Sequence, residues 1–334
     1  MSKIKPAKGS PYARILGVGG YRPTRVVPNE VILETIDSSD EWIRSRSGIA
    51  SRHWASPQET VAAMSVEASG KALADAGISP EQIGAVIVST VSHFKQTPAV
   101  ATEIAHRIGA VKPAAFDISA GCAGFGYGLT LAKGMVVEGS AEYVLVIGVE
   151  RLSDLTDLED RATAFLFGDG AGAVVVGPSQ EPAIGPTVWG SEGDKSETIK
   201  QTVPWDEYRS TDTAQKFPAI TQEGQAVFRW AVFEMAKVAQ QALDAAGITA
   251  DDLDVFIPHQ ANMRIIDSMV KTLKLPEHVT VARDVETTGN TSAASIPLAM
   301  ERLLATGAAK SGDTALVIGF GAGLVYAATV VTLP

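Results

Sequence analysis

The residue types best suited to chemistry are one cysteine, one histidine and one asparagine, each in a glycine-rich or turn-forming setting. Cys122 is the single cysteine of the 334 residues and stands in DISAGCAGFGYG. His259 follows FIP, and Asn290 follows TTG in TTGNTSAAS. A thiol assisted by an imidazole and a carboxamide is suited to nucleophilic attack on an acyl group. The question is whether the fold brings the three together.

The setting of Cys122 favours a nucleophile. PAAFDISAG (113–121) predicts a strand entering a tight turn, and the apolar spacing that follows predicts a helix ending at Gly139. Free amides and the helix dipole favour an anion at a helix start, so we expect a lowered thiol pKa. The glycines between 121 and 128 each weaken a helix by roughly 1 kcal/mol relative to alanine, which suggests a close approach. A free cysteine is also commonly an inert buried residue.

The other two residues occupy similar places. DLDVFI (252–257) predicts a strand, so His259 stands at a strand end, where ligands of α/β sheets bind. Asn290 precedes a predicted helix, where it also fits a simple N-cap. GFGAGLV (319–325) predicts a turn whose free amides point at one oxygen. With the Cys122 amide, this turn would form an oxyanion hole.

Three pairs of segments repeat in the same order, about half a chain length apart. The pairs are 72–90 with 242–260, 164–177 with 315–328, and 120–132 with 288–300. We interpret the second pair as two Gly-rich turns, and the third sets Cys122 opposite Asn290. The repeats predict two related α/β halves, residues 1–180 and 181–334, joined through 178–225, which has no counterpart of similar length.

The composition indicates a globular protein and argues against several classes. Hydrophobic residues make up 46% and charged residues 20% of the chain, and no apolar run of roughly 18 residues indicates a membrane span. The N-terminus lacks the apolar stretch of a secretory signal, so the cytoplasm is the expected location. A formal charge of −10 argues against a nucleic-acid partner. One cysteine and five histidines offer no metal-ligand cluster.

Six strings together resemble the thiolase-fold condensing enzymes, and within them the β-ketoacyl-[acyl carrier protein] synthase III family. The strings are SSDEWIRSRSGI (38–49), DISAGCAGF (117–125), EDRATAFLFGDGAGA (159–173), HQAN (259–262), TTGNTSAASIP (287–297) and GFGAG (319–323). The resemblance spans essentially the whole chain. It implies a thiolase-like fold in which two halves, related by a pseudo-twofold axis, form α/β/α/β/α layers.

The resemblance also implies roles at the catalytic centre. Cys122, His259 and Asn290 would form the catalytic triad, and the amides of Cys122 and Ala322 the oxyanion hole. The family usually has glycine where this chain has Ala322, which matters only if that residue needs a positive φ. The implied reaction loads the acyl group of an acyl-coenzyme A onto Cys122. Decarboxylative condensation with malonyl-acyl carrier protein follows, and no cofactor or metal is required.

Further residues are assigned by the same resemblance. The coenzyme A and pantetheine site would comprise Trp42, Arg46, Arg161, Gly224, Phe228 and Asn262. Trp42 and Arg161 would sandwich the adenine, as aromatic and guanidinium faces can, although Trp42 alone also fits a core aromatic. The acyl pocket would include Leu152 and Phe167.

A basic surface is expected near the channel mouth, because acyl carrier proteins are strongly acidic and this chain is acidic overall. The predicted docking residues are Arg229, Gln260, Arg264 and Lys271, with Lys274 nearby. A solvated helix face is the alternative interpretation. A homodimer is implied by the family, with VSHFKQTP (91–98) as a segment that reaches across its interface.

Competing functions remain within and outside the fold. A thiolase would need a second catalytic cysteine, and an elongating synthase a histidine where Asn290 stands. Plant-type polyketide synthases share the triad, but the HQAN and GNTSAASIP strings fit the initiating synthase better. A starter enzyme or acyltransferase of secondary metabolism is the nearer alternative. A non-catalytic partner subunit is disfavoured because Cys122 is retained.

Overall fold

The computed structural model describes residues 4–210 and 216–334, and two five-stranded sheets form its frame. The first sheet has the order β1-β7-β6-β4-β5, with β1 (Tyr12–Tyr21), β7 (Asp169–Ser179), β6 (Tyr143–Arg151), β4 (Ile83–Ser89) and β5 (Ala114–Ile118). The second has the order β8-β14-β13-β11-β12, with β8 (Val188–Gly190), β14 (Val325–Thr332), β13 (Thr314–Gly321), β11 (Val255–Pro258) and β12 (Thr280–Val281).

The two sheets repeat one topology. In each, the strand next to one edge is parallel to both of its neighbours: β4 to β5 and β6, and β11 to β12 and β13. The next two strands are antiparallel, as β7 and β1 in the first sheet and β14 and β8 in the second. Identical order and direction in both halves is the arrangement expected from an internal repeat.

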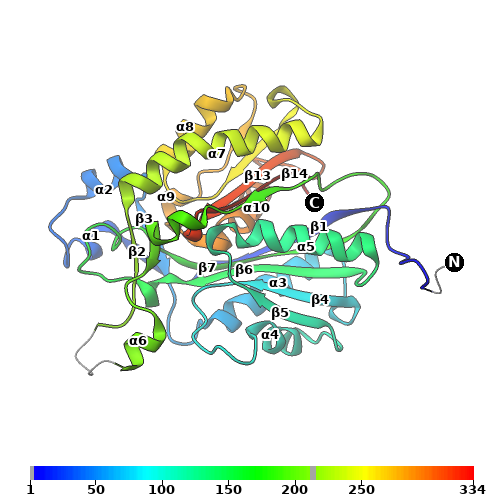
Figure 1. The fold of residues 1–334 in the computed structure, drawn as a ribbon, viewed down its shortest axis with the longest axis horizontal. Helices are drawn as coiled ribbons and strands as arrows, with labels where there is room; N and C mark the ends of the chain where they lie inside the picture. Colours follow the sequence, from blue (N-terminus) through cyan, green and yellow to red (C-terminus); the bar gives the residue numbers. More distant parts are fainter. Residues whose placement is uncertain (1–3, 211–215) are drawn as a thin grey trace.

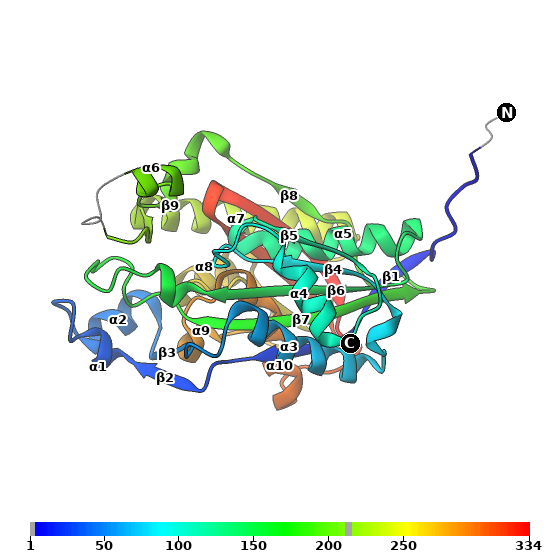
Figure 2. The same cartoon turned by 90° about the horizontal axis from the view of Figure 1, so that it is seen from below.

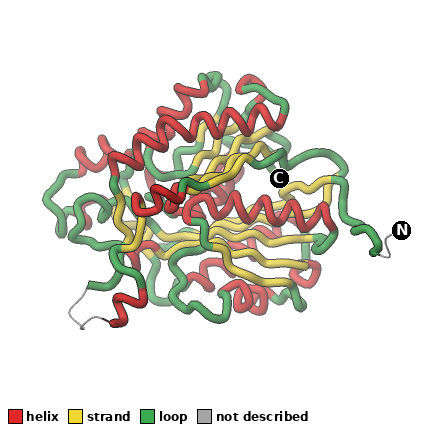
Figure 3. The backbone as a smooth tube through the Cα atoms, in the orientation of Figure 1, coloured by secondary structure: helices red, strands yellow, loops and turns green. Residues whose placement is uncertain are grey.

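Helices separate and cover the sheets in five layers (Figures 1 and 3). The outer layer on the first sheet holds α3 (Val61–Ala76) and α4 (Val100–Ile108); the middle layer holds α5 (Gly124–Glu138) and α10 (Ser295–Thr306); the outer layer on the second sheet holds α7 (Gly224–Ala246) and α8 (Met263–Leu273). Both middle helices contact strands of the two sheets. The predicted α/β/α/β/α arrangement is confirmed.

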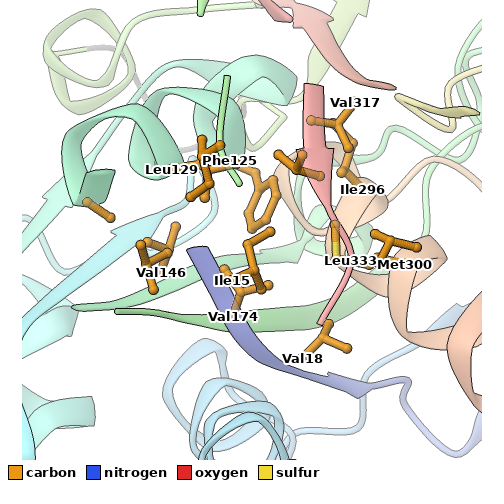
Figure 4. Packing of buried hydrophobic residues seen from close by; sticks show 14 of the residues in the cluster. Ile15, Val18, Phe125, Leu129, Val146, Val174, Ile296, Met300, Val317 and Leu333 are labelled. Carbon is orange, nitrogen blue, oxygen red and sulfur yellow. The ribbon is translucent and has the colours of Figure 1, made fainter. Parts of the chain in front are cut away.

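The middle layer is held by apolar packing on both sides (Figure 4). Phe125 of α5 and Ile296 of α10 belong to one buried cluster with Val146 and Val174 of the first sheet and Val317 of the second. Full burial of one such side chain contributes about 1.5–3 kcal/mol. This core fixes the starts of α5 and α10 against the strand ends that carry the candidate site.

The first repeat is confirmed in detail. Helices α3 and α7 both end at a glycine in the left-handed region, Gly77 (φ 64°) and Gly247 (φ 73°). A short 3-10 turn with a capping box follows each glycine, η1 (Pro80–Gln82) and η5 (Ala250–Asp252). The turns lead into equivalent strands of the two sheets, β4 and β11.

The other two repeats are partly wrong in register. GDGAG at 168–172 is not a turn, because strand β7 begins at Asp169, whereas the similar string in the second half does end a strand. Before α5 and α10 stand the 3-10 turns η2 (Gly121–Ala123) and η6 (Ser292–Ala294). The first residue of η2, Gly121, therefore corresponds to Ser292, and Cys122 does not correspond to Asn290.

Two insertions cover the same end of the molecule, and both lie to the left in Figures 1 and 2. The first, between β1 and α3, contains β2 (Arg25–Pro28), α1 (Asn29–Ile32), α2 (Asp40–Ser47) and β3 (Ser51–Trp54). The second, between β8 and α7, contains η4 (Gly193–Thr198), β9 (Ile199–Gln201), α6 (Trp205–Ser210) and β10 (Ile220–Gln222). The segment expected to lack a counterpart therefore has one. Among the described residues no helix is long and apolar enough to span a bilayer.

Candidate active site

One cavity of about 740 Å³ brings the three candidate residues together. Cys122 reaches it from the first half of the chain, and His259 and Asn290 from the second. Leu152 and Phe167, expected in the acyl pocket, also line it. The cavity is thus built at the junction of the two halves.

Cys122 stands in η2, between the end of β5 and the start of α5. Strand β13 passes directly beside it: a Cβ atom on Gly321 would lie 2.7 Å from the cysteine sulfur. Real Cβ atoms are not found that close, so glycine is required at 321 for this approach. The cysteine of one half is therefore held against the strand end of the other.

The thiol pKa differs from the sequence-based expectation. Burial, and to a smaller extent the carboxyl of Glu150, raises the pKa of Cys122 to about 12, although a hydrogen bond from Ser292 opposes the shift. The expected lowering at the helix start is wrong because desolvation of the thiolate dominates. At neutral pH the sulfur is protonated, so attack on an acyl group requires that its proton be moved.

His259 follows β11 and is held as a neutral imidazole. Burial lowers its pKa to about 3. Its Nδ1 lies 2.7 Å from Ser295 Oγ, and that oxygen also accepts a hydrogen bond from the backbone N–H of Gln260 at 3.4 Å. When Ser295 donates its own proton to Nδ1, the imidazole proton is on Nε2. In that tautomer His259 presents a hydrogen-bond donor to the cavity.

Asn290 has its amide orientation fixed by the backbone. Its Oδ1 accepts from the Ser292 N–H at 2.8 Å. Its own N–H donates to Leu166 O at 2.8 Å, and its carbonyl accepts from Gly168 at 3.0 Å. With the side-chain oxygen engaged, the NH₂ group remains available as a donor. His259 and Asn290 thus supply two neutral N–H donors to the Cys122 cavity.

Alanine at position 322, where the family usually has glycine, is compatible with the turn. Ala322 begins η7 (Ala322–Leu324) and lines the cavity. It is not among the residues with positive φ; Gly323 carries that conformation instead, at 79°. A Cβ on Gly121 would lie 3.3 Å from the Ala322 nitrogen, so this amide is adjacent to the Cys122 turn. The oxyanion hole formed by the Cys122 and Ala322 amides stays a prediction.

A second cavity of about 670 Å³ adjoins the first. Asn290, Ala261 and Ile265 line both. Of the residues predicted for coenzyme A and pantetheine, the second cavity is lined by Trp42, Arg46, Gly224, Phe228 and Asn262. The two cavities together form a route from the nucleotide-side residues to the thiol.

Arg161 lies outside that lining and directly against Trp42. Its guanidinium carbon is 4.9 Å from the centre of the Trp42 ring, and Arg46 is 5.8 Å from it. A ring sandwiched between two groups lies at least about 3.5 Å from each of them, so the two groups must be roughly 7 Å apart. For the predicted sandwich to form around an adenine, Arg161 must therefore move away from Trp42.

Asn262 has a structural role that the sequence did not reveal. Its Oδ1 caps α8 by accepting from the Arg264 amide at 2.9 Å, and its Nδ2 donates to Arg46 O at 2.9 Å. The same two helices touch where a Cβ on Gly48 would lie 2.4 Å from Met263 Cβ. Asn262 therefore joins α2 to α8 at the wall of the second cavity.

The predicted docking residues divide into two groups. Arg229, Arg264 and Lys271 are exposed, and the two arginines border the second cavity. Gln260 is fully buried, and its amide donates to Pro258 O at 2.7 Å while its Oε1 accepts from Val285 N at 3.1 Å. Its assignment to carrier-protein docking is wrong, because the residue after His259 points into the protein.

Sequence reasoning missed an aromatic wall of the first cavity. Phe94 and Trp205 line it, with ring centres 5.6 Å apart in an edge-to-face contact. Phe217 contacts both rings. These residues come from the 91–98 segment and from the second insertion, whose polar composition concealed their position. Among the described residues no cluster of three metal-binding side chains occurs.

Comparisons with known proteins agree with this architecture. The family model for 3-oxoacyl-[acyl-carrier-protein] synthase III matches residues 116–193, and the model for its C-terminal region matches 243–333. β-Ketoacyl-[acyl-carrier-protein] synthase III of Streptomyces glaucescens is 88% identical over 100% of both chains. Synthase III 1 of Streptomyces coelicolor is 87% identical, again over 100% of both.

Solved structures show the same likeness. A priming β-ketosynthase of a polyketide biosynthetic pathway has a TM-score of 0.97 and 48% identity, covering 100% of this chain and 99% of its own. A 3-oxoacyl-[acyl-carrier-protein] synthase III from Aquifex aeolicus has a TM-score of 0.87 and 38% identity, covering 96% and 99%. On these matches the chain belongs to the β-ketoacyl-[acyl-carrier-protein] synthase III family of condensing enzymes.

Proposed function

We propose that the protein starts fatty acid synthesis by condensing an acyl group from acyl-coenzyme A with malonyl-acyl carrier protein. One observation carries the proposal: a thiol from one half and two neutral N–H donors from the other line a single cavity, which a second cavity joins to a basic rim. Membership of the synthase III family supports the same reaction. The reaction needs no redox cofactor and no metal.

In the first half-reaction, Cys122 Sγ attacks the thioester carbon and coenzyme A leaves. The amides of Cys122 and Ala322 hold the oxygen of the tetrahedral intermediate in this scheme. In the second, malonyl-acyl carrier protein loses CO₂, and His259 Nε2–H and Asn290 Nδ2–H donate to the enolate oxygen. Each such donor is worth about 3 kcal/mol of transition-state stabilisation. The enolate carbon then attacks the acyl-cysteine.

Single-turnover acylation with a panel of acyl-coenzyme A thioesters tests the proposal. We expect the mass of the protein to rise by one acyl group on Cys122, with acetyl, propionyl and branched starters distinguished by rate. Malonyl-acyl carrier protein should then discharge the acyl group as β-ketoacyl-acyl carrier protein. An acyl-enzyme that forms but is discharged only to another acceptor would refute the initiating role.

A starter enzyme of polyketide synthesis is the second candidate. The priming β-ketosynthase with a TM-score of 0.97 favours it. Both candidates share the site, so they differ in the starter and in the carrier protein they accept. Parallel assays with a fatty acid carrier protein and a polyketide carrier protein, each loaded with malonate, separate them. We also propose that the protein is a homodimer, which sedimentation would test. Its proposed location is the cytoplasm, which cell fractionation would test.

Arg264→Glu is expected to impair use of the carrier protein about tenfold more than attack on acyl-coenzyme A. The side chain is exposed at the start of α8 and stacks over Phe228 at 4.7 Å, at the rim of the second cavity. Charge reversal there repels an acidic partner and lowers its association rate. The two half-reactions are measured separately, by acyl-enzyme formation and by condensation.

Lys310→Glu provides the matched control. Lys310 is exposed and precedes β13 at the end remote from Gly321, about 25 Å away by the length of that strand. It makes the same charge change without altering the rim, so both half-reactions should remain unchanged. Equal losses in the two half-reactions of Arg264→Glu would contradict the docking role.

A further inference from the structure

The thiol proton is not accounted for by the groups described so far. Cys122 must lose a proton to form a thioester, and His259 is a poor acceptor because its Nδ1 faces Ser295 Oγ and burial depresses its pKa. A buried carboxyl, Glu150, lies at the end of β6 and is fully shielded from solvent. The reaction as outlined gives it no role.

Ser292 links the thiol to this carboxyl. Its side chain is a hydrogen-bond partner of Cys122 and also of Glu150. The backbones of η6 and β6 are in close contact, because a Cβ on Gly148 would lie 2.1 Å from Ala293 O. Gly148 and Glu150 share one face of the strand, because side chains alternate. Glu150 therefore faces the turn that carries Ser292.

Ser292 is held in an unfavourable backbone conformation. Its φ is 47°, and Gly121, at the equivalent position before α5, has a φ of 48°. Glycine adopts this region without cost, whereas a residue with a Cβ is strained there. The first half uses glycine, and the second half keeps a hydroxyl at the same turn. A strained non-glycine residue at a site is consistent with a need for its side chain.

Glu150 is held in a polar pocket that supports its ionised form. Ser92 Oγ donates to it at 2.6 Å, Thr90 Oγ1 at 3.3 Å and the Val91 amide at 3.1 Å. These donors oppose the effect of burial, which raises the pKa of Glu150 to about 7. The carboxyl can therefore both accept and return a proton under neutral conditions.

We propose that Glu150, acting through Ser292, accepts the proton of Cys122 during acyl transfer and returns it during condensation. Glu150 is a positioning residue in this scheme, because Ser292 and not Glu150 contacts the sulfur. The proposal rests on the acyl-transfer role of Cys122 given above.

In acyl transfer the S–H bond of Cys122 breaks as its sulfur bonds to the acyl carbon. The proton passes to Ser292 Oγ, whose own proton passes to Glu150, and coenzyme A leaves as the thiolate. In condensation the enolate bonds to the acyl carbon and the C–S bond to Cys122 breaks. The departing thiolate regains a proton from Ser292, which is reprotonated by Glu150. Each half-reaction balances in protons and charge.

Other titratable groups near Glu150 have their own partners or a different position. Arg151, the next residue of β6, pairs with Asp154 at 3.1 Å. Asp169 on β7 accepts from the Ala55 amide at 2.7 Å. His93 and Asp117 border the same cavity. The charge of Glu150 raises the pKa of the Cys122 thiol.

Iodoacetamide alkylation of Cys122 between pH 5 and pH 10 tests the relay without acyl-coenzyme A or carrier protein. In the unaltered protein the rate should rise with pH through about 7, as Glu150 ionises. Glu150→Gln and Ser292→Ala should each lower the rate at pH 7.5 by about 100-fold, the lower end of a positioned base's contribution. The inflection near neutrality should disappear, and Glu150→Asp should partly restore it.

Faster alkylation of Cys122 in the Glu150→Gln variant would overturn the proposal. If Glu150 only repels the thiolate, Glu150→Gln removes a negative charge, lowers the thiol pKa and accelerates alkylation. Ser292→Gly keeps the backbone relaxed and removes the same hydroxyl, so it replaces Ser292→Ala if that variant unfolds. Asp169→Asn, a buried carboxyl on the adjacent strand, should leave the shape of the pH profile unchanged. An unaltered profile in the Glu150 and Ser292 variants would also refute the relay.

Discussion

Cys122→Ala is expected to form no acyl-enzyme and to lose condensation by a factor on the order of 10⁶, as when a nucleophile is removed from a catalytic set. Alanine fits the site, because it removes only the sulfur that lies closest to Gly321. The change therefore affects chemistry rather than packing. Intact-mass analysis after incubation with acyl-coenzyme A measures the first half-reaction, and product formation from malonyl-acyl carrier protein the second.

Decarboxylation provides the internal control for this variant. His259 and Asn290 retain their hydrogen bonds to Ser295 and Ser292, so Cys122→Ala should still release CO₂ from malonyl-acyl carrier protein. Acylation of the variant at another residue, or loss of decarboxylation together with condensation, would contradict the division of labour between the two halves of the site.

His259→Ala and Asn290→Asp should each lower condensation by about 10²–10³-fold, the cost of removing one oxyanion donor. Asparagine and aspartate have the same shape, so Oδ1 of the variant can still accept from Ser292, while the second oxygen presents a negative charge instead of an N–H. Decarboxylation should fall with condensation. Acyl-enzyme formation should be retained within about tenfold, because a positioned donor is lost rather than the thiol or its base.

The pH dependence gives a further test of the His259 assignment. Because burial lowers the pKa of His259 to about 3, the imidazole stays neutral throughout the pH range of activity. Condensation should then show no loss of rate attributable to His259 as pH falls through 6.5. If His259→Ala abolished acylation as completely as condensation, the histidine would be the base for the thiol, and the Glu150 relay would be wrong as well.

The sequence predicted the layered architecture of the two halves better than the alignment of their internal repeats. The AGI turns predicted matching helix ends because only glycine closes a helix so readily in the left-handed region, as Gly77 and Gly247 do. The later repeats slipped by a few residues, because Gly-rich and Ala-rich strings align in several ways. That slip placed Asn290 opposite Cys122 and left the correspondence of Gly121 with Ser292 unseen.

Side-chain direction and desolvation could not be obtained from the sequence. Gln260 follows His259 and is predicted from the sequence to face a partner, but its side-chain amide forms hydrogen bonds with the backbone inside the protein. The thiol pKa was expected to fall because the helix start is visible in the sequence, whereas burial of the sulfur depends on β13 from the other half. Phe94 and Trp205 meet only after the second insertion folds over the cavity.

The shared lining of the second cavity has a kinetic consequence. Trp42 and Arg46, expected to hold the nucleotide, border the same space as Arg229 and Arg264, expected to receive the carrier protein. Because Asn262 ties α2 to α8, this mouth does not divide into separate entrances. The departing coenzyme A and the arriving carrier would overlap there, so the two substrates take turns. Initial-rate plots would then consist of parallel lines, the pattern of a ping-pong enzyme.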